Sequence, residues 1–258
     1  MTPPPRRIVS LVPSLTETVA DLGVAKSLVA CTQYCSEPRS RVRHLPRVGG
    51  TKSLDRERIA RLAPDLVLCN EEENREDDIV WFEERFRVHR SLPTTVKAAS
   101  EVIRTLGEQL QRPHEAESLL LEVEAQLLRS EVEALRGRAP RVFYPIWRQP
   151  WIGINQDTYV HDLLVRAGAV NVCANRESRY PVLSTEDLKE LRPDLVLLPS
   201  EPFAFSEEHR RELLRDNVFG RRVPILMVDG RDFCWHGSRS GRGLGRALNV
   251  LQPFRRAG

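Results

Sequence analysis

The sequence predicts an α/β protein of two lobes, each a three-layer αβα arrangement around a mostly parallel sheet, joined by one long backbone α-helix. Three observations support this fold class. The 258 residues suffice for two domains of ordinary size, one block of sequence occurs twice, and a continuous helical pattern separates the two copies. Hydrophobic residues make up 41% of the chain and charged residues 29%, so a substantial core is expected.

The first strand and helix are predicted in RIVSLVP and SLTETVADLG. The apolar run in the first stretch is typical of a buried parallel strand. Ser14 and Glu17 match the capping-box pattern of a helix start, and Gly23 is placed to end that helix. A looser copy follows later in the chain, with RVFYPIW as the strand and DTYVHDLLVRAGA as the helix.

The clearest repeat relates LDRERIARLAPDLVL, which begins at Leu54, to LSTEDLKELRPDLVL, which begins at Leu183. In each copy a serine, Ser53 or Ser184, is placed to cap a short helix, a proline ends the helix, and DLVL forms a buried strand. Because the same helix–strand unit recurs, we expect the second lobe to repeat the first.

The segment from Pro113 to Gly137, PHEAESLLLEVEAQLLRSEVEALRG, is predicted as a single helix. Proline in its first turn, glycine at its end and apolar residues at helical spacing indicate about 23 residues and roughly 35 Å. We therefore expect an N-terminal α/β lobe at 1–112, a connecting backbone helix at 113–137 and a C-terminal α/β lobe at 138–258. A helix of this length would act as a stiff strut, so we expect a ligand cleft that changes little on binding.

Composition restricts the partners and the compartment. The net charge is +3 and the basic residues alternate with acids, which favours solvated helices over a nucleic-acid surface. No run reaches the ~18–20 consecutive apolar residues of a membrane-spanning helix. The sequence as written shows no signal peptide, so it predicts a cytoplasmic location; a misassigned start or a removed leader would allow a periplasmic or cell-surface location instead. We also expect a monomer. Five cysteines without framework spacing fit a reducing compartment.

Four stretches together resemble a known family. They are RIVSLVPSLTE, the block GG-x-x-x-L-x-x-ERI-x-x-L-x-PDLVL, the connecting helix and the second PDLVL. The sequence resembles the class III substrate-binding proteins of ABC importers, the helical-backbone metal-receptor superfamily, and within it the cobalamin-binding branch. The resemblance covers nearly the whole chain. It implies a non-enzymatic receptor that needs no cofactor, holds a corrinoid (cobalamin-like) or other metal-chelate ligand between its lobes, and serves an ABC transporter permease.

The resemblance also implies ligand-binding positions. Tyr34 in TQYCSEP, Trp151 in RQPWIG and Tyr180 in SRYP match aromatic positions of the cobalamin cleft. The stretch DFCWHGSR matches the loop that closes over the far edge of the ligand. Thr51 and Asn70 stand where the enteric cobalamin receptor has tryptophans, so at these two ligand positions the sequence departs from the family pattern.

The repeated acids Glu57 and Glu186 match, in the same resemblance, two acids at the lobe tips that dock into arginine pockets of the permease. The simpler interpretation is that they are surface charges of two short helices. The missing signal peptide favours that interpretation, because docking to an importer requires export.

Further aromatic residues concentrate in the predicted loops after strands. Ligands of open α/β sheets bind outside the carboxyl ends of the strands, and aromatic faces suit a flat macrocycle. We therefore predict ligand contacts from Tyr144, Trp147, Phe233 and Trp235 as well, with Phe203 and Phe205 close by. The alternative is that these rings fill the interior of the lobes.

His236 can provide a ligand to cobalt or haem iron, and Arg239, like Arg148, can pair with a phosphate or carboxylate of the ligand. The alternatives are a hydrogen-bonded imidazole and ordinary surface guanidinium groups. No zinc spacing and no nucleophile elbow occurs, so the sequence predicts neither a metal site nor catalytic residues. Two other functions stay open: a ferric-siderophore or haem receptor, and a cytoplasmic corrinoid- or metal-handling accessory protein that uses Cys234 and His236.

Overall fold

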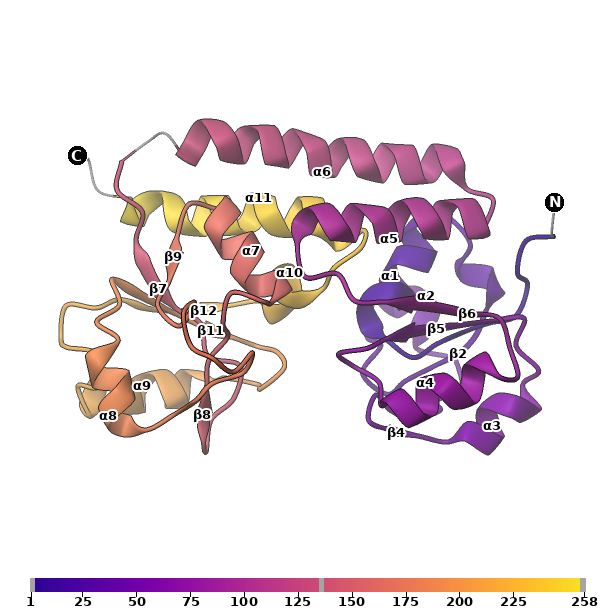
Figure 1. Cartoon of the computed structure of the whole chain (residues 1–258), viewed down its shortest axis with the longest axis horizontal. Coiled ribbons are helices and arrows are strands. Elements are labelled where there is room, and N and C mark those ends of the chain that lie inside the picture. Colours follow the sequence, from indigo (N-terminus) through magenta and orange to yellow (C-terminus); the bar gives the residue numbers. More distant parts are fainter. Residues whose placement is uncertain (1–2, 135–136, 256–258) are drawn as a thin grey trace. The chain divides into compact units, whose positions relative to one another are not determined.

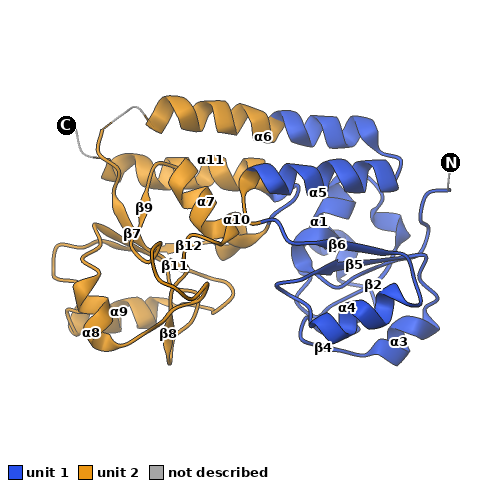
Figure 2. Cartoon of the chain, viewed as in Figure 1, with its two compact units in different colours: residues 1–93, 97–121, 236–239 blue, residues 94–96, 122–235, 240–258 orange. Residues whose placement is uncertain are grey.

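The computed structural model describes residues 3–134 and 137–255, which form two compact units (Figure 2). Of these residues, unit 1 contains 3–93, 97–121 and 236–239, and unit 2 contains 94–96, 122–134, 137–235 and 240–255. Each unit has a four-stranded parallel sheet with helices on both of its faces (Figure 1). The predicted fold class is therefore confirmed.

The sheet of unit 1 has the strand order β2-β1-β5-β6, and every neighbouring pair is parallel. Both central strands, β1 and β5, are fully buried, as the apolar runs predict. A two-stranded antiparallel hairpin, β3 with β4, lies outside this sheet. The strands are β1 (Ile8–Ser10), β2 (Leu28–Cys31), β3 (Gly49–Gly50), β4 (Ser53–Leu54), β5 (Leu66–Asn70) and β6 (Val88–Ser91).

Helices cover both faces of this sheet, with α1 and α5 on one face and α3 and α4 on the other (Figure 1). The core on one side contains Val9, Val67, Ile59, Ile79 and Phe82, all completely buried. The helices of unit 1 are α1 (Pro13–Asp21), α2 (Arg39–Val42), α3 (Arg56–Arg61), α4 (Glu76–Glu83) and α5 (Val96–Gln109), with the 3-10 turn η1 (Ala25–Ser27).

Two predicted helix caps in unit 1 are wrong. Asp55, not Ser53, caps α3 by accepting a hydrogen bond from the Arg58 N–H at 2.9 Å. Ser14 lies inside α1, whose N-cap residue Val12 makes no side-chain cap. Ser53 is used in the hairpin strand β4, so the chain enters α3 two residues later than the serine pattern suggests. The glycine stop is correct, because Gly23 follows α1 with a φ of +80°.

The sheet of unit 2 has the order β12-β11-β7-β9, again entirely parallel, and β8 pairs with β10 in an antiparallel ribbon. Read from the opposite edge, the order is β9-β7-β11-β12. It corresponds strand by strand to the order β2-β1-β5-β6 in unit 1. The sequence repeat is thus a repeat of topology. The strands are β7 (Arg141–Phe143), β8 (Trp151–Ile152), β9 (Val170–Asn171), β10 (Val182–Leu183), β11 (Leu195–Pro199) and β12 (Ile225–Val228).

In unit 2, α7, α10 and α11 lie on one face of the sheet and α8 and α9 on the other (Figure 1). The cap prediction for α8 is confirmed, because Ser184 and Asp187 form a reciprocal capping box. The helices are α7 (Tyr159–Arg166), α8 (Thr185–Glu190), α9 (Glu207–Arg215), α10 (Gly230–Cys234) and α11 (Arg239–Leu251), with the 3-10 turn η2 (Gln252–Phe254).

The long helix α6 (Pro113–Ala134) has 22 residues and begins at the predicted proline. Its predicted end at Gly137 follows residues 135–136, which lie outside the described residues. It contributes 113–121 to unit 1 and 122–134 to unit 2. Val123 is buried, whereas Leu128 and Val132 are exposed, so the apolar face of the helix is only partly covered.

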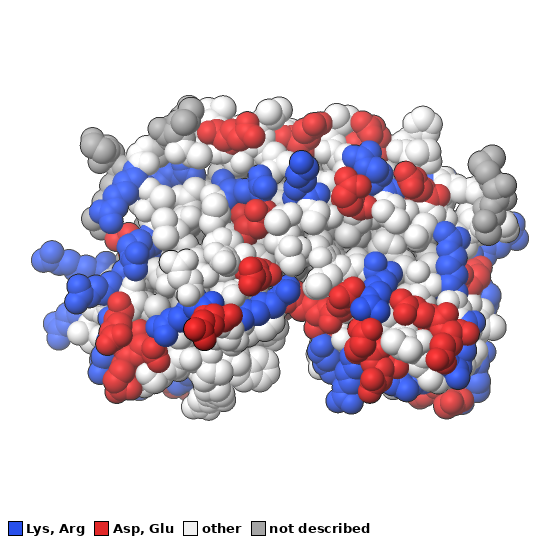
Figure 3. Space-filling view, in the orientation of Figure 1, with Lys and Arg blue, Asp and Glu red and all other residues white. Residues whose placement is uncertain are grey.

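The surface carries both signs of charge close together. On the face shown in Figure 3, acidic and basic side chains are interspersed over both units. Arg90, for example, pairs with Glu71 at 2.8 Å and with Glu76 at 2.9 Å. Among the described residues, no helix combines the length and the apolar character that a membrane crossing requires.

Candidate ligand-binding site

Several candidate ligand residues lie at or just beyond the carboxyl ends of the parallel strands. In unit 1, Tyr34 lies three residues beyond β2 and Asn70 is the last residue of β5. In unit 2, Tyr144 directly follows β7, and Phe203 lies in the loop after β11. Carboxyl ends of parallel strands are the usual ligand-binding edge of open α/β sheets, so the topology places these residues where a site is expected.

Tyr34 is exposed to solvent, with 56% of the residue accessible. It sits in a turn that is closed by a hydrogen bond from the Cys35 N–H to the Thr32 carbonyl at 3.2 Å. The adjacent hairpin leaves room for the ring because Gly50 has no side chain, and a Cβ there would lie 3.3 Å from Tyr34 Cε2. The Gly-Gly pair in VGGTKSL is therefore the sequence signal for this arrangement.

Thr51 and Asn70, predicted as ligand residues, are buried and make local contacts. Asn74 Nδ2 donates to the Thr51 carbonyl at 3.1 Å. Asn70 Nδ2 donates to the Ser91 carbonyl at 3.0 Å, and its Oδ1 accepts backbone N–H groups from residues 72 and 73 at 2.9 and 3.1 Å. Asn70 therefore fixes the loop after β5 through both of its amide atoms.

His236 is buried inside unit 1, where its Nε2 lies 3.3 Å from Asn70 Nδ2 and 3.4 Å from Ser14 Oγ. The structure thus brings two predicted site residues, Asn70 and His236, into contact. Burial, followed by the charge of nearby His89, lowers the pKa of His236 to about 4. The imidazole is therefore neutral at physiological pH, and its Nε2 lies within hydrogen-bond distance of two protein side chains.

Arg239 is committed to an ion pair in the same part of unit 1. Its Nε donates to Glu17 Oε2 at 2.7 Å, and the two side chains are 9% and 7% exposed. The preceding Ser238 N–H donates to Thr18 Oγ1 at 3.1 Å. Residues 236–239 are therefore anchored to α1, and Glu17 serves this contact, not the helix cap that the sequence predicts. Pairing with Glu17 competes with the predicted contact to an anionic ligand group.

Unit 2 contains a group of five rings that we call the aromatic group: Trp147, Trp151, Phe203, Phe205 and His209. Trp151 stacks on Phe205 at 5.9 Å between ring centroids, and Phe203 lies 5.4 Å from Trp147 and 4.7 Å from Phe205. Within the group, Trp147 is the ring that is most open, with 44% of the side chain exposed. His209, which the sequence reasoning missed, packs against both phenylalanines.

The other predicted residues of unit 2 divide by exposure. Tyr144 and Phe233 are each 1% exposed and pack on each other at 5.6 Å. Trp235 is 4% exposed, and its indole N–H donates to Glu201 at 2.9 Å. Tyr180 is half-buried and lies beneath the Arg179 guanidinium at 5.8 Å. Arg148 forms an ion pair with the side chain of Glu212 and also lies 5.9 Å from the Trp151 ring.

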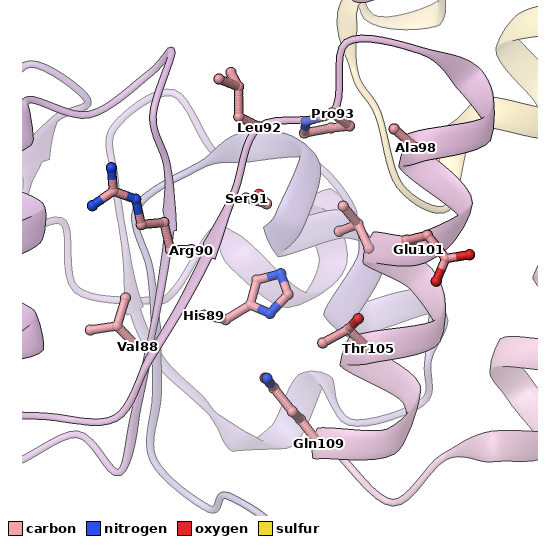
Figure 4. A pocket seen from close by; sticks show the side chains of 11 residues that line it. Val88, His89, Arg90, Ser91, Leu92, Pro93, Ala98, Glu101, Thr105 and Gln109 are labelled. Atoms are coloured by element: carbon pink, nitrogen blue, oxygen red, sulfur yellow. The ribbon is translucent and has the colours of Figure 1, made fainter.

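A separate cavity of about 460 Å³ lies in unit 1 between β6 and α5 (Figure 4). His89, Thr105 and Gln109 line it, and none of the predicted ligand residues does. His89 is 5% exposed, and burial lowers its pKa to about 4. This cavity is therefore distinct from the ring-lined surfaces after the strands.

The repeated acids occupy equivalent positions in the two units. Glu57 lies in the first turn of α3 and Glu186 in the first turn of α8, and both are exposed. Elsewhere, the described residues hold no group of three or more His, Cys, Asp or Glu side chains placed to bind a metal ion.

The model of the periplasmic binding protein family matches residues 8–219. The chain belongs to this family. Its members bind vitamin B12, haem or siderophores and are not enzymes, so the chain is a substrate-binding protein of this kind.

Relatives of the chain include several vitamin B12-binding proteins. The chain is 24% identical over 207 residues to the one from Vibrio cholerae serotype O1, covering 80% of this chain and 72% of the relative. It is 25% identical over 243 residues to the one from Yersinia pestis, covering 88% of this chain and 85% of the relative.

Solved structures with the same fold bind either ligand class. The periplasmic vitamin B12 binding protein of Vibrio cholerae superposes with a TM-score of 0.84 at 21% identity, covering 97% of this chain and 98% of that chain. A periplasmic heme binding protein from Pseudomonas aeruginosa superposes equally well, with a TM-score of 0.84 at 25% identity, covering 98% and 95%. Fold similarity therefore does not select between corrinoid and haem.

Proposed function

We propose that this chain is the substrate-binding protein of an ABC importer and that its ligand is a corrinoid. The observation that carries the proposal is the pair of rings Tyr34 and Trp147. They are the two aromatic side chains among the exposed large hydrophobic residues of the described chain, one in each unit. Each follows a parallel strand, and a flat macrocycle with an apolar face is the ligand that such rings suit.

The surroundings of His236 support a corrinoid over a ligand that needs a metal bond from this residue. Its Nε2 faces Asn70 and Ser14, and Arg239 is paired with Glu17. Cyanocobalamin brings both axial ligands of its cobalt, so a receptor can hold it by stacking and hydrogen bonds alone. The vitamin B12-binding relatives point to the same ligand.

Haem is the second candidate, and one observation favours it. The exposed phenol of Tyr34 can supply a tyrosinate ligand to ferric iron, a known mode of haem ligation. The heme binding protein of Pseudomonas aeruginosa, with its equal TM-score, adds support. The two candidates assign different parts of Tyr34 to the ligand: its ring face for a corrinoid and its hydroxyl for haem.

The test is a titration of the purified protein with cyanocobalamin, haem and a ferric siderophore, followed by calorimetry and visible absorption. For a corrinoid we expect one-to-one binding with a Kd of about 1 μM or lower. Tyr34→Ala and Trp147→Ala should each weaken it by about 10-fold or more, because each removes an aromatic contact face. Leu121→Ala is the matched control, since Leu121 on α6 is also 56% exposed.

Tyr34→Phe separates the two ligands, because it keeps the ring and removes the hydroxyl. Under the corrinoid proposal this variant retains cyanocobalamin affinity within about threefold. Binding of haem by the wild type, with a visible spectrum that Tyr34→Phe abolishes, together with no binding of cyanocobalamin, would replace the corrinoid by haem. Binding of only the siderophore would reject both macrocycles.

We also assign Glu57 and Glu186 to docking on the permease. This role requires the protein to lie on the outer side of the membrane, from which an importer takes up its substrate. Both acids are exposed at equivalent helix starts of the two units. Charge reversal of both to arginine should reduce ligand uptake by about 10-fold while ligand affinity stays unchanged. Glu190→Arg, at the opposite end of α8, is the control.

Cell fractionation with the native upstream sequence tests the location. Protein found only in the cytoplasm, or uptake that the double reversal leaves intact, would remove the transport part of the proposal. Ligand affinity would be unaffected by either result.

A further inference from the structure

Two cysteines of unit 1 lie together at the base of the Tyr34 turn. Cys31 ends β2 and Cys35 follows four residues later, and they are 0% and 1% exposed. The two cysteines and Val42 form a small buried cluster. The spacing of the five cysteines fits a reducing compartment, but polar groups surround the sulfurs of this pair.

The environment of the Cys35 sulfur is polar despite its burial. Thr16 Oγ1 donates to it at 3.0 Å, and the Thr32 hydroxyl lies 3.2 Å away. Burial by itself would raise the pKa of this thiol, but hydrogen bonds from Cys31 and from both threonines lower it to about 7. Donation to Cys35 and burial raise the pKa of the Cys31 thiol. One sulfur is therefore disposed to carry the charge and the other to keep its proton.

A guanidinium group holds the pair in place. Arg47 Nη1 donates to Cys31 Sγ at 2.9 Å, to the Thr32 carbonyl at 2.8 Å and to the Cys35 carbonyl at 2.9 Å. Its Nη2 donates to the Val42 carbonyl at 3.0 Å. The guanidinium contacts the Cys31 sulfur, where its charge partly offsets the rise in the pKa of that thiol, and its bonds to the Thr32 and Cys35 carbonyls hold the turn.

We propose that Cys31 and Cys35 form a reversible disulfide that controls the position of Tyr34. The oxidant is a peroxide. The Cys35 thiolate attacks one peroxide oxygen, the O–O bond breaks, and the released hydroxide takes a proton to become water. The Cys31 sulfur then attacks the Cys35 sulfenic acid, so that an S–S bond forms, the S–O bond breaks, and the Cys31 proton leaves with hydroxide as water. Two thiols lose two electrons and two protons, and the peroxide is reduced to two water molecules.

Access to the pair runs through the turn itself. Gln33, Tyr34 and Ser36 are exposed on either side of Cys35, so a local opening of this short turn uncovers the sulfur. Closing the sulfurs to the ~2.05 Å of a disulfide removes the thiol contacts to Thr16 and Arg47 and draws the ends of the turn together. Because Tyr34 lies between the two cysteines, its ring moves with the turn.

The experiment compares reduced protein with protein treated with hydrogen peroxide and then denatured for thiol counting. The five thiols of the reduced chain should fall to three, with a mass loss of two hydrogens and a peptide linked through Cys31 and Cys35. Dithiothreitol should restore all five. Cys35→Ser should keep its four thiols, whereas the control Cys69→Ser, at a buried thiol whose pKa burial raises to about 12, should fall from four to two.

A wild-type chain that keeps five thiols, or that links other cysteines, would overturn the proposal even if the serine variant does not fold. This readout needs no ligand and is independent of the proposed function. The effect on Tyr34 rests on that function: we expect oxidation to change cyanocobalamin affinity by about threefold or more. Disulfide formation with unchanged cyanocobalamin affinity would refute only the claim that the disulfide controls Tyr34. If the reduced protein does not bind cyanocobalamin, the corrinoid assignment is refuted instead.

Discussion

Protonation of His236 should destabilise unit 1 in mild acid. This imidazole is 7% exposed, and its pKa of about 4 in the folded protein lies below the ~6.5 of an unfolded chain. Because the unfolded state binds the proton first, stability is complete above the unfolded pKa and falls as the pH drops from about 6.5 towards 4. At pH 5.0 the loss is about 2 kcal/mol in the free energy of unfolding.

His89 adds to this effect. Burial lowers its pKa to about 4 as well, and the charge of His89 adds to the lowering of the pKa of His236. Both imidazoles therefore contribute to the loss of stability in acid. The contribution of His236 to the loss of stability is therefore measured as the difference between the wild type and a His236 variant, not from the total loss of stability in acid.

Urea unfolding followed by circular dichroism between pH 7.5 and 5.0 measures this difference. We expect His236→Gln to lose about 2 kcal/mol less than the wild type over this range, whatever its stability at pH 7.5. His114→Gln, at an exposed histidine of α6, should follow the wild type. The same dependence on pH in wild type and His236→Gln would show that His236 does not cause the loss of stability in acid.

Two other substitutions test packing and the buried ion pair. Glu17→Gln leaves the Arg239 guanidinium buried without its carboxylate and should lower the free energy of urea unfolding by about 3–5 kcal/mol. Adding Arg239→Met to the same chain should restore most of this loss. A loss below about 1 kcal/mol for Glu17→Gln would show that the pair is solvated. Gly107→Ala places a Cβ 2.4 Å from Ala116 Cβ and should lower the free energy of unfolding by about 1–3 kcal/mol in thermal denaturation. Gly245→Ala, which meets only the end of a flexible glutamine side chain at 3.0 Å, should cost less; equal effects would contradict close packing of α5 against α6.

Features set by local sequence were predictable. The two DLVL strands are buried, α6 begins at Pro113, and Ser184 caps α8. Each depends on residues within one turn or one strand, where propensity and capping chemistry decide the outcome. Ser14 and Glu17 match the same capping pattern but do not cap α1. Their side chains instead contact His236 and Arg239, which lie more than 200 residues away in the sequence.

The candidate site was predictable in its residue types but not in their exposure. Aromatic residues after strands are visible in the sequence, yet the structure leaves Tyr34 and Trp147 open and buries Tyr144, Phe233 and Trp235. Exposure depends on which neighbours pack on each ring, and those neighbours come from distant elements. The gap at Gly50 that accommodates Tyr34 is one such case.

The sequence alone determined the α/β class, the repeated unit and the long helix, because hydrophobic period, caps and breakers act over a few residues. The family resemblance also lies in those local motifs. Only the tertiary structure decided that His236 and Arg239 are buried against α1 and that Cys31 and Cys35 join one buried cluster. These outcomes depend on contacts between chain segments that packing brings together, and short-range patterns carry no information about which segments will meet.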